Sequence, residues 1–221
     1  KGIDVEFDAN MNDPKVFKQW QEGTSMGIFQ FESQGMTNFM KELKPDCLED
    51  IIAGVSLYRP GPMDQIPRYI ANKKDPEHAV YTHPSLKPIL KVTYGCMVYQ
   101  EQVMQIVRDL AGYSLGRADL VRRAMGKKKL DVMAKEREIF INGQVDENGN
   151  VIVPGCVRNG IDEVSANKIF DEMAEFAKYA FNKSHAACYA VVAYRTAYLK
   201  TYYPNEFMAA MLNSFLGNLD K

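Results

Sequence analysis

The sequence has no uninterrupted apolar run of about 20 residues, the length that a membrane-spanning helix needs. It opens with an acidic stretch where a secretory signal would place its hydrophobic segment. We therefore expect no membrane association. Position 1 is not methionine, which suggests a fragment of a longer protein. The chain has 221 residues, of which 46% are hydrophobic and 25% are charged, the composition of a folded globular protein.

Cysteine and histidine are too sparse for a zinc site. The four cysteines, Cys47, Cys96, Cys156 and Cys188, lie 49, 60 and 32 positions apart, and the chain holds three histidines. No C-x-x-C pair is present, so the spacing of structural zinc ligands is missing. Scattered cysteines without a secretion signal predict reduced, buried thiols in a cytosolic protein.

Charge is nearly balanced overall but unevenly distributed. The net charge is −1, yet residues 117–137 carry +5, residues 138–177 carry −6 and residues 178–203 carry +4 without a single acidic residue. Separation of this kind favours a site for a polyanion, and the alternative is a solvated charged surface.

The periodicity of apolar residues predicts a mainly helical chain. Ser33, Asp46 and Ser114 are expected N-caps, and Gly112 and Gly126 are expected stops. A short extended segment is predicted at 27–31, a mostly irregular connection at 60–95, and a β-hairpin around an Asn-Gly pair at 148–149. The expected helices run through 33–43, 48–58, 66–72, 99–110, 114–125, 130–141, 161–179, 184–203 and 206–216.

Two acidic patterns raise the question of a metal. Asp4, Glu6 and Asp8 alternate with apolar residues, which could place three carboxylates on one face of a strand as in a two-metal site, but a solvated strand is favoured. The acidic loop at 146–150 lacks the glycine and the final glutamate of a calcium loop, so calcium is rejected there.

Two basic segments are candidate anion sites. Five cations, Arg122, Arg123, Lys127, Lys128 and Lys129, fall within eight residues at the end of a predicted helix. A helix dipole explains two of them, whereas a bound phosphate chain would explain all five. Solvation of the whole face is the alternative.

The second basic segment begins the long helix predicted at 184–203. Its N-terminus follows Lys183, and free backbone N–H groups there would attract phosphate. One side of the helix would present His185 and Tyr189 to a sugar or base, and the other would be core. A buried tyrosine in an ordinarily capped helix is the alternative. The two stripes are His185, Tyr189, Val192, Thr196 and Lys200, and Val191, Tyr194, Tyr198 and Tyr202.

Seven motifs, in this order, resemble the C-family of bacterial replicative DNA polymerases, the DNA polymerase III alpha subunits. They are Gly-Ile-Phe-Gln-Phe-Glu-Ser at 27–33, Tyr-Arg-Pro-Gly-Pro at 58–62, Tyr-Gln-Glu-Gln-Val-Met at 99–104, Ala-Gly-Tyr-Ser-Leu-Gly at 111–116, Arg-Arg-Ala-Met-Gly-Lys-Lys at 122–128, Phe-Asn-Lys-Ser-His at 181–185 and Tyr-Tyr-Pro-Asn-Glu-Phe-Met-Ala at 202–209. The resemblance implies a multi-helix fingers domain over residues 31–221, preceded by a trailing element of the palm or connector over residues 1–30.

The resemblance also implies the roles of the basic segments. Arg122, Arg123, Asn182, Lys183, Ser184, His185 and Tyr189 would bind the incoming deoxynucleoside triphosphate, and Arg59, Lys127 and Lys128 would be additional phosphate or DNA contacts. The catalytic carboxylates and their Mg²⁺ would belong to the palm, so this chain would hold no catalytic residue and no metal and would be inactive alone.

Further implications concern partners. Primer-template DNA, deoxynucleoside triphosphates and the palm and thumb domains of the same polypeptide would contact this region. The sliding clamp and other replisome subunits would bind elsewhere on the parent chain, in the bacterial cytoplasm. Two other hypotheses remain: a stand-alone helical module that binds nucleic-acid backbones without polymerase function, and a purely structural helical domain.

Overall fold

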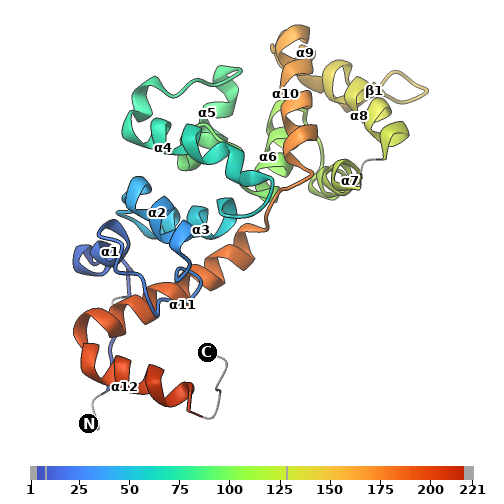
Figure 1. Ribbon diagram of the computed structural model, residues 1–221. Helices are drawn as coiled ribbons and strands as arrows, with labels where there is room; N and C mark the ends of the chain where they lie inside the picture. Colours follow the sequence, from blue (N-terminus) through green and yellow to red (C-terminus); the bar gives the residue numbers. More distant parts are fainter. Residues whose placement is uncertain (1–3, 8, 128, 217–221) are drawn as a thin grey trace. The chain divides into compact units, whose positions relative to one another are not determined.

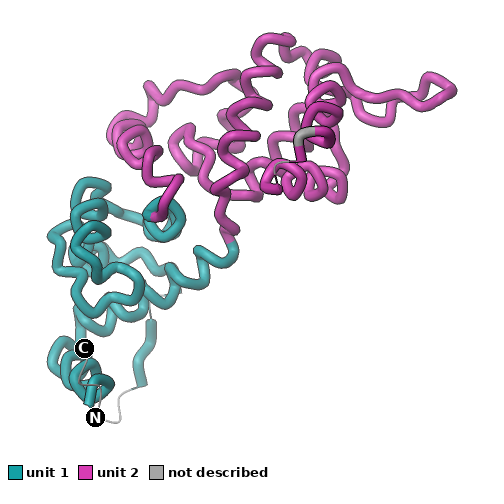
Figure 2. The backbone as a smooth tube through the Cα atoms, turned by 45° about the vertical axis from the view of Figure 1, so that its right-hand side comes forward, with its two compact units in different colours: residues 1–58, 184–221 teal, residues 59–183 magenta. Residues whose placement is uncertain are grey.

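A computed structural model describes residues 4–7, 9–127 and 129–216, and it is mainly α-helical with one small hairpin (Figure 1). The expected fold class is therefore confirmed. The chain divides into two compact units, residues 1–58 with 184–221 and residues 59–183 (Figure 2). None of the helices in the described part of the chain combines the length and apolar character that a bilayer crossing requires.

The first unit is built from helices at both ends of the chain. These are α1 Pro14–Gln21, α2 Gln34–Leu43, α3 Leu48–Leu57, α12 Pro204–Ser214 and α11 Lys183–Tyr202, apart from the first residue of α11. Phe17 of α1 meets Tyr194 of α11 edge to face, with ring centroids 5.7 Å apart. The Tyr194 hydroxyl also accepts a 2.8 Å hydrogen bond from the backbone N–H of Asp13, the N-cap of α1. A buried aromatic contact thus joins α1 to α11.

The second unit holds the larger apolar core. Its helices are α4 Ile66–Lys74, α5 Lys87–Leu90, α6 Gln100–Ala111, α7 Leu115–Gly126, α8 Leu130–Asn142, α9 Gly155–Arg158 and α10 Glu163–Phe176, with short 3-10 turns at Pro62–Gln65, Pro76–His78, Pro84–Leu86 and Lys91–Thr93. The α6 stripe of Val103, Ile106, Val107 and Leu110 is buried, as the periodicity predicted. Around α6 pack α5, α7, α8 and α9.

The hairpin forms where the Asn-Gly pair predicted it. Strand β1 Gln144–Val145 pairs antiparallel with β2 Val151–Val153, and Gly149 turns the chain with a φ of +82°. Asp146 stabilises the turn, because its Oδ1 accepts the backbone N–H groups of Asn148 and Asn150.

Several local predictions were wrong. Residues 27–31 form turns with positive φ at Gly27 and Gln30 in place of an extended segment. The N-cap of α3 is Cys47, not Asp46, whose backbone N–H donates to Asp50 Oδ2. Gly126 is not the stop beyond α7: it is the last residue of that helix, and Lys127 is the C-cap. Short helices occupy much of 60–95.

Burial along α11 also differs from the two stripes predicted for this helix. The buried face consists of Ala186, Ala190, Ala193 and Ala197 together with Tyr194, while Tyr202 is exposed. The tyrosine stripe was therefore core at Tyr194 but not at its end. Small side chains let neighbouring segments approach the helix closely, so the alanine face is buried although the prediction placed the core on the tyrosine stripe.

The cysteines follow the expectation of burial only in part. Cys96 and Cys156 are buried, whereas Cys47 is half-buried and Cys188 is exposed on α11. Burial raises the pKa of the Cys96 thiol to about 11 and that of the Cys156 thiol to about 12.

Candidate functional site

Several predicted cations of the second unit gather around one backbone pairing. Tyr99, just before α6, pairs in a parallel bridge with Phe181, just before α11. The Gln100 N–H donates to the Phe181 carbonyl at 2.9 Å, and Gln100 Nε2 donates to the Ala180 carbonyl at 3.0 Å. This pairing fixes the start of α6 beside the segment that leads into α11. Several side chains lie beside this pairing, and Arg122, Asp119 and Arg123 connect to it through Gln100. We call the whole group the basic cluster: Arg59, Gln100, Glu101, Asp119, Arg122, Arg123, Asn182 and Lys183.

Arg122 and Arg123 share one carboxylate on α7. Arg122 donates to Asp119 Oδ1 from Nε at 3.0 Å and from Nη2 at 2.7 Å. Arg123 Nε lies 2.8 Å from Asp119 Oδ2. The hydrogen bond from Arg122 lowers the pKa of the Asp119 carboxyl, so Asp119 is ionised at neutral pH. Arg122 also reaches α6, because its Nη1 donates to Gln100 Oε1 at 2.9 Å.

Glu101 occupies the start of α11. Its carboxylate accepts the Lys183 backbone N–H at 3.0 and 3.1 Å and the Asn182 Nδ2 at 2.9 Å. A carboxylate at a helix N-terminus is favourable for the same dipole and hydrogen-bonding reasons as a phosphate. The prediction that the N–H groups at this helix start are free for phosphate was therefore wrong at Lys183, where the protein supplies its own anion.

Arg59 and Lys183 approach the same pairing through aromatic rings. The Arg59 guanidinium lies 4.1 Å from the centroid of the Phe181 ring, and its Nη2 donates to the Tyr179 carbonyl at 3.0 Å. The Lys183 Nζ lies 5.2 Å from the centroid of Tyr99. Both contacts have cation–π geometry. The two cations thus stand beside the Tyr99–Phe181 pairing, Arg59 on one ring and Lys183 on the other.

The remaining predicted residues lie in the first unit, on α11. His185 and Tyr189 have ring centroids 4.4 Å apart, and Phe29 lies 5.3 Å from Tyr189. His185 and Ser184 are exposed and Tyr189 is half-buried. The rings of Phe29, His185 and Tyr189 form what we call the aromatic face, a surface on which a base could stack.

The far end of the predicted α11 stripe is covered by the protein itself. Thr196 Oγ1 accepts the Phe29 N–H at 3.2 Å, and Lys200 Nζ donates to the Met26 carbonyl at 2.7 Å. The stripe is therefore covered at Thr196 and Lys200 and open nearer to His185 and Tyr189. Lys127 is exposed at the end of α7, and Lys128 lies outside the described residues.

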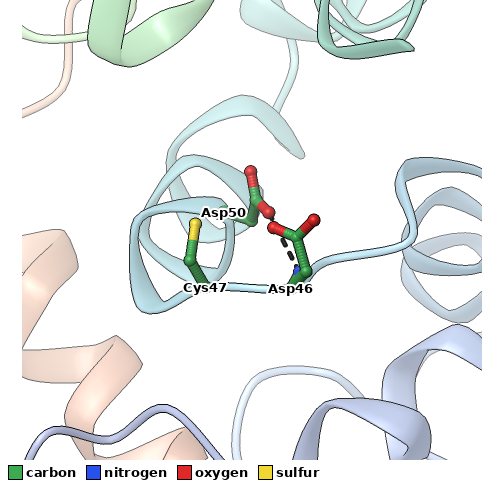
Figure 3. Close-up of side chains that lie close together, drawn as sticks. All are labelled: Asp46, Cys47 and Asp50. Carbon is green, nitrogen blue, oxygen red and sulfur yellow. Dashed lines mark hydrogen bonds between the residues drawn. The ribbon is translucent and has the colours of Figure 1, made fainter. Parts of the chain in front are cut away.

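Among the described residues, one group has the spacing of metal ligands. Asp46, Cys47 and Asp50 lie together at the start of α3, where Asp50 Oδ2 accepts the Asp46 N–H at 3.1 Å (Figure 3). Magnesium requires hard oxygen ligands in octahedral geometry, and a thiol does not supply one. Asp50 is wholly buried and completes a turn, which accounts for its position. This group does not fit Mg²⁺. The strand expected at 4–8 is not formed by residues 4–7, and Asp8 lies outside the described residues.

A cavity of about 360 Å³ opens elsewhere in the second unit. Three carboxylates border it, from Asp64, Glu172 and Glu175, against the single cation Arg68. An acidic rim repels phosphate, so this cavity is a poorer place for a nucleotide than the basic cluster.

Three members of the basic cluster were missed from the sequence: Gln100, Glu101 and Asp119. Asp119 carried a signal, because its spacing to Arg122 and Arg123 is i, i+3 and i, i+4 on one helix. Gln100 and Glu101 were quoted only as parts of a motif, and their partners lie about 80 positions along the chain.

A family model described as the bacterial DNA polymerase III alpha subunit finger domain matches residues 1–148. The chain belongs to this family. The DNA polymerase III alpha subunit of Xylella fastidiosa is 52% identical over 212 residues, covering 96% of this chain and 17% of that protein. The corresponding subunit of Thermus aquaticus is 48% identical over 227 residues, covering 100% and 18%. That of Chlamydia muridarum is 50% identical over 214 residues, covering 96% and 16%.

The finger-domain chain therefore spans about one-sixth of the length of these relatives. Its membership of the alpha-subunit family confirms the resemblance read from the seven motifs. A stand-alone nucleic-acid-binding module is not favoured, because the match runs over nearly the whole chain to one part of a polymerase subunit.

Proposed function

We propose that this chain is the fingers module of a bacterial replicative DNA polymerase, which binds the incoming deoxynucleoside triphosphate and the primer-template. One observation carries the proposal: Arg59, Arg122 and Lys183, from distant parts of the sequence, all approach the Tyr99–Phe181 pairing. Asp119 and Glu101 balance part of this positive charge within the protein. A triphosphate would add the anion that a convergence of cations favours, in a family of polymerase subunits.

Each predicted residue has a place in this proposal. Arg122, Arg123 and Lys183 supply positive charge to the phosphates, and Asn182 and Ser184 supply hydrogen bonds. His185 and Tyr189, on the aromatic face of α11, stack against the nascent base pair. Arg59, Lys127 and Lys128 add contacts to phosphate or DNA. Phosphoryl transfer depends mainly on positioning and charge neutralisation, which side chains of these types provide.

The chemistry itself belongs elsewhere in the proposal. Mg²⁺ is held by palm carboxylates, not by Asp46, Cys47 and Asp50, and the catalytic step is not assigned to any residue of this chain. Residues 1–30 act as a trailing element of the palm or connector and residues 31–221 as the fingers. The palm and thumb of the same polypeptide complete the site, and clamp and replisome subunits bind the parent chain in the bacterial cytoplasm.

The test uses an intact alpha subunit that contains this chain. Changing both Arg122 and Arg123 to alanine should raise the KM for the incoming nucleotide roughly tenfold or more in single-nucleotide insertion, because charge-assisted hydrogen bonds are lost. Arg108→Ala is the matched control, since it removes an exposed Arg–Asp pair on α6 outside the basic cluster. An unchanged nucleotide KM in the double variant would contradict the proposal.

A second measurement separates nucleotide binding from DNA-backbone binding. If the basic cluster held DNA phosphates alone, the double variant would weaken primer-template binding and flatten its salt dependence while leaving the nucleotide KM unchanged. The isolated chain incubated with Mg²⁺ and primer-template should not extend the primer. Robust extension would show that it holds the catalytic carboxylates after all.

A further inference from the structure

We infer that the two arginines assigned to the phosphates above differ in role: Arg123 contacts the triphosphate directly, whereas Arg122, together with Asp119, positions Arg123. The inference rests on the function proposed above and divides the labour within that site. It starts from a difference between the two neighbouring arginines, whose side chains are 21% and 62% exposed.

Arg122 is committed to the protein at every nitrogen of its guanidinium. Its Nε and Nη2 donate to Asp119, and its Nη1 donates to Gln100. Gln100 is itself anchored, because its Nε2 donates to the Ala180 carbonyl and its N–H to the Phe181 carbonyl. Arg122 therefore ties α7 to the start of α6 and to the segment before α11, and its fork is not directed at solvent.

Arg123 is held at one end only. Its Nε contacts Asp119 Oδ2 at 2.8 Å, and its two terminal nitrogens donate no hydrogen bond within residues 4–7, 9–127 and 129–216. The four N–H groups on those nitrogens form the planar fork that binds phosphate oxygens in pairs. Anchoring Nε orients this fork while leaving it exposed.

Asp119 links the two roles. One carboxylate oxygen takes both contacts from Arg122 and the other takes the contact from Arg123. Gln100 restricts the orientation of Arg122, and Arg122 in turn restricts the orientation of the Asp119 carboxylate. The carboxylate then restricts the rotamers of Arg123, because it holds the Nε of that side chain. An arginine loses substantial rotamer freedom when it binds a ligand, so a side chain ordered in advance binds more tightly.

The experiment is a double-mutant cycle in the intact alpha subunit, read as the KM and kcat of single-nucleotide insertion. Arg123→Ala should raise the nucleotide KM by roughly tenfold or more. Asp119→Asn and Arg122→Gln should each raise it in the same direction but by less, because the fork of Arg123 remains. In the Arg123→Ala background neither should raise it further, because both act through Arg123. Arg108→Ala again serves as the control for losing an arginine.

Each outcome decides a separate point. Additive effects of Arg122→Gln and Arg123→Ala would overturn the inference by showing that both arginines touch the ligand. A lower KM in Asp119→Asn would overturn it by showing that Asp119 competes with phosphate. An unchanged KM in Arg123→Ala with a raised KM in Arg122→Gln would reverse the assignment. No effect in any variant would instead remove the proposed function. Thermal unfolding and primer-template affinity should be unchanged in all variants, which separates a loss of positioning from a loss of folding. If Asp119→Asn does not fold, Arg122→Gln still tests the inference.

Discussion

Nη1 of Arg122 donates a 2.9 Å hydrogen bond to Oε1 of Gln100, so the C-terminal part of α7 is joined to the first residue of α6. The Nε2 of Gln100 donates a hydrogen bond to the Ala180 carbonyl. A single amide therefore connects three segments of the second unit, and the orientation of both its ends is fixed by the partner that each meets.

Gln100→Ala should lower the free energy of unfolding by about 1–3 kcal/mol, because it removes two hydrogen bonds, one of them to a charged group. The same variant should raise the nucleotide KM of the intact subunit, since Arg122 loses its anchor. Gln105→Ala, an exposed glutamine on the same helix, is the control and should change neither quantity. Urea denaturation and single-nucleotide insertion measure the two effects. Equal stability of the two variants would show that the Gln100 contacts contribute nothing.

Glu101→Ala should destabilise the start of α11 by about 1 kcal/mol, the usual contribution of a side-chain cap. Glu101→Gln keeps an acceptor but loses the charge that favours a helix N-terminus, so its effect should be smaller. Amide hydrogen exchange at Lys183 measures the opening directly, because this N–H donates to Glu101. Exchange as slow in Glu101→Ala as in the unaltered chain would exclude the capping role.

Alkaline pH should destabilise the second unit through Tyr113. Burial, followed by the charge of Glu136, raises the pKa of the Tyr113 hydroxyl well above its ordinary value of 10.0. The folded state then keeps a proton that the unfolded state releases. Stability is therefore full below pH 10 and falls above it, by at most about 1.4 kcal/mol per pH unit.

Tyr113→Phe provides the check on that slope. The hydroxyl donates to Glu136 at 2.9 Å, so its loss should cost about 1–2 kcal/mol at pH 8. Urea denaturation between pH 8 and pH 11 should show a shallower decline in the variant, because phenylalanine does not titrate. Parallel declines would mean that Tyr113 does not cause the alkaline loss.

Gly143→Ala should be among the most damaging single substitutions, costing more than about 3 kcal/mol. Gly143 has φ +83° and ψ −174°, a region that is essentially restricted to glycine, and an added Cβ would lie 2.3 Å from the Pro154 carbonyl oxygen. Gly149→Ala is the matched control, with φ +82° but nothing within 4 Å, and should cost about 1 kcal/mol. Thermal unfolding of both variants tests the difference, and similar midpoints would refute the clash.

The sequence was most informative where local physics decides the structure. The stripe of α6, the Ser33 and Ser114 caps and the Asn-Gly hairpin depend on residues within one or two turns of each other, and each formed as predicted. The fold class followed from these elements.

Long-range electrostatics limited the prediction of the candidate site. Nothing near Lys183 in the sequence shows that Glu101, 82 positions earlier, satisfies the start of α11. The aromatic face depends on a contact between Phe29 and Tyr189. All of the second unit, residues 59–183, separates these two residues in the sequence. The Asp119 pairing was the exception, since helical spacing alone could have revealed it. The roles of Arg122, Arg123, Asn182, Lys183, Ser184, His185 and Tyr189 stay predictions.

Cys188 makes α11 open to site-specific chemistry. A thiol-directed fluorophore reacts with accessible thiolates, and burial keeps Cys96 and Cys156 both covered and protonated at neutral pH. Replacing half-buried Cys47 with serine would leave Cys188 as the main reactive position in this chain. Because it directly precedes Tyr189, a dye attached there would place an optical reporter next to the aromatic face, and its emission could follow occupancy of that face in real time.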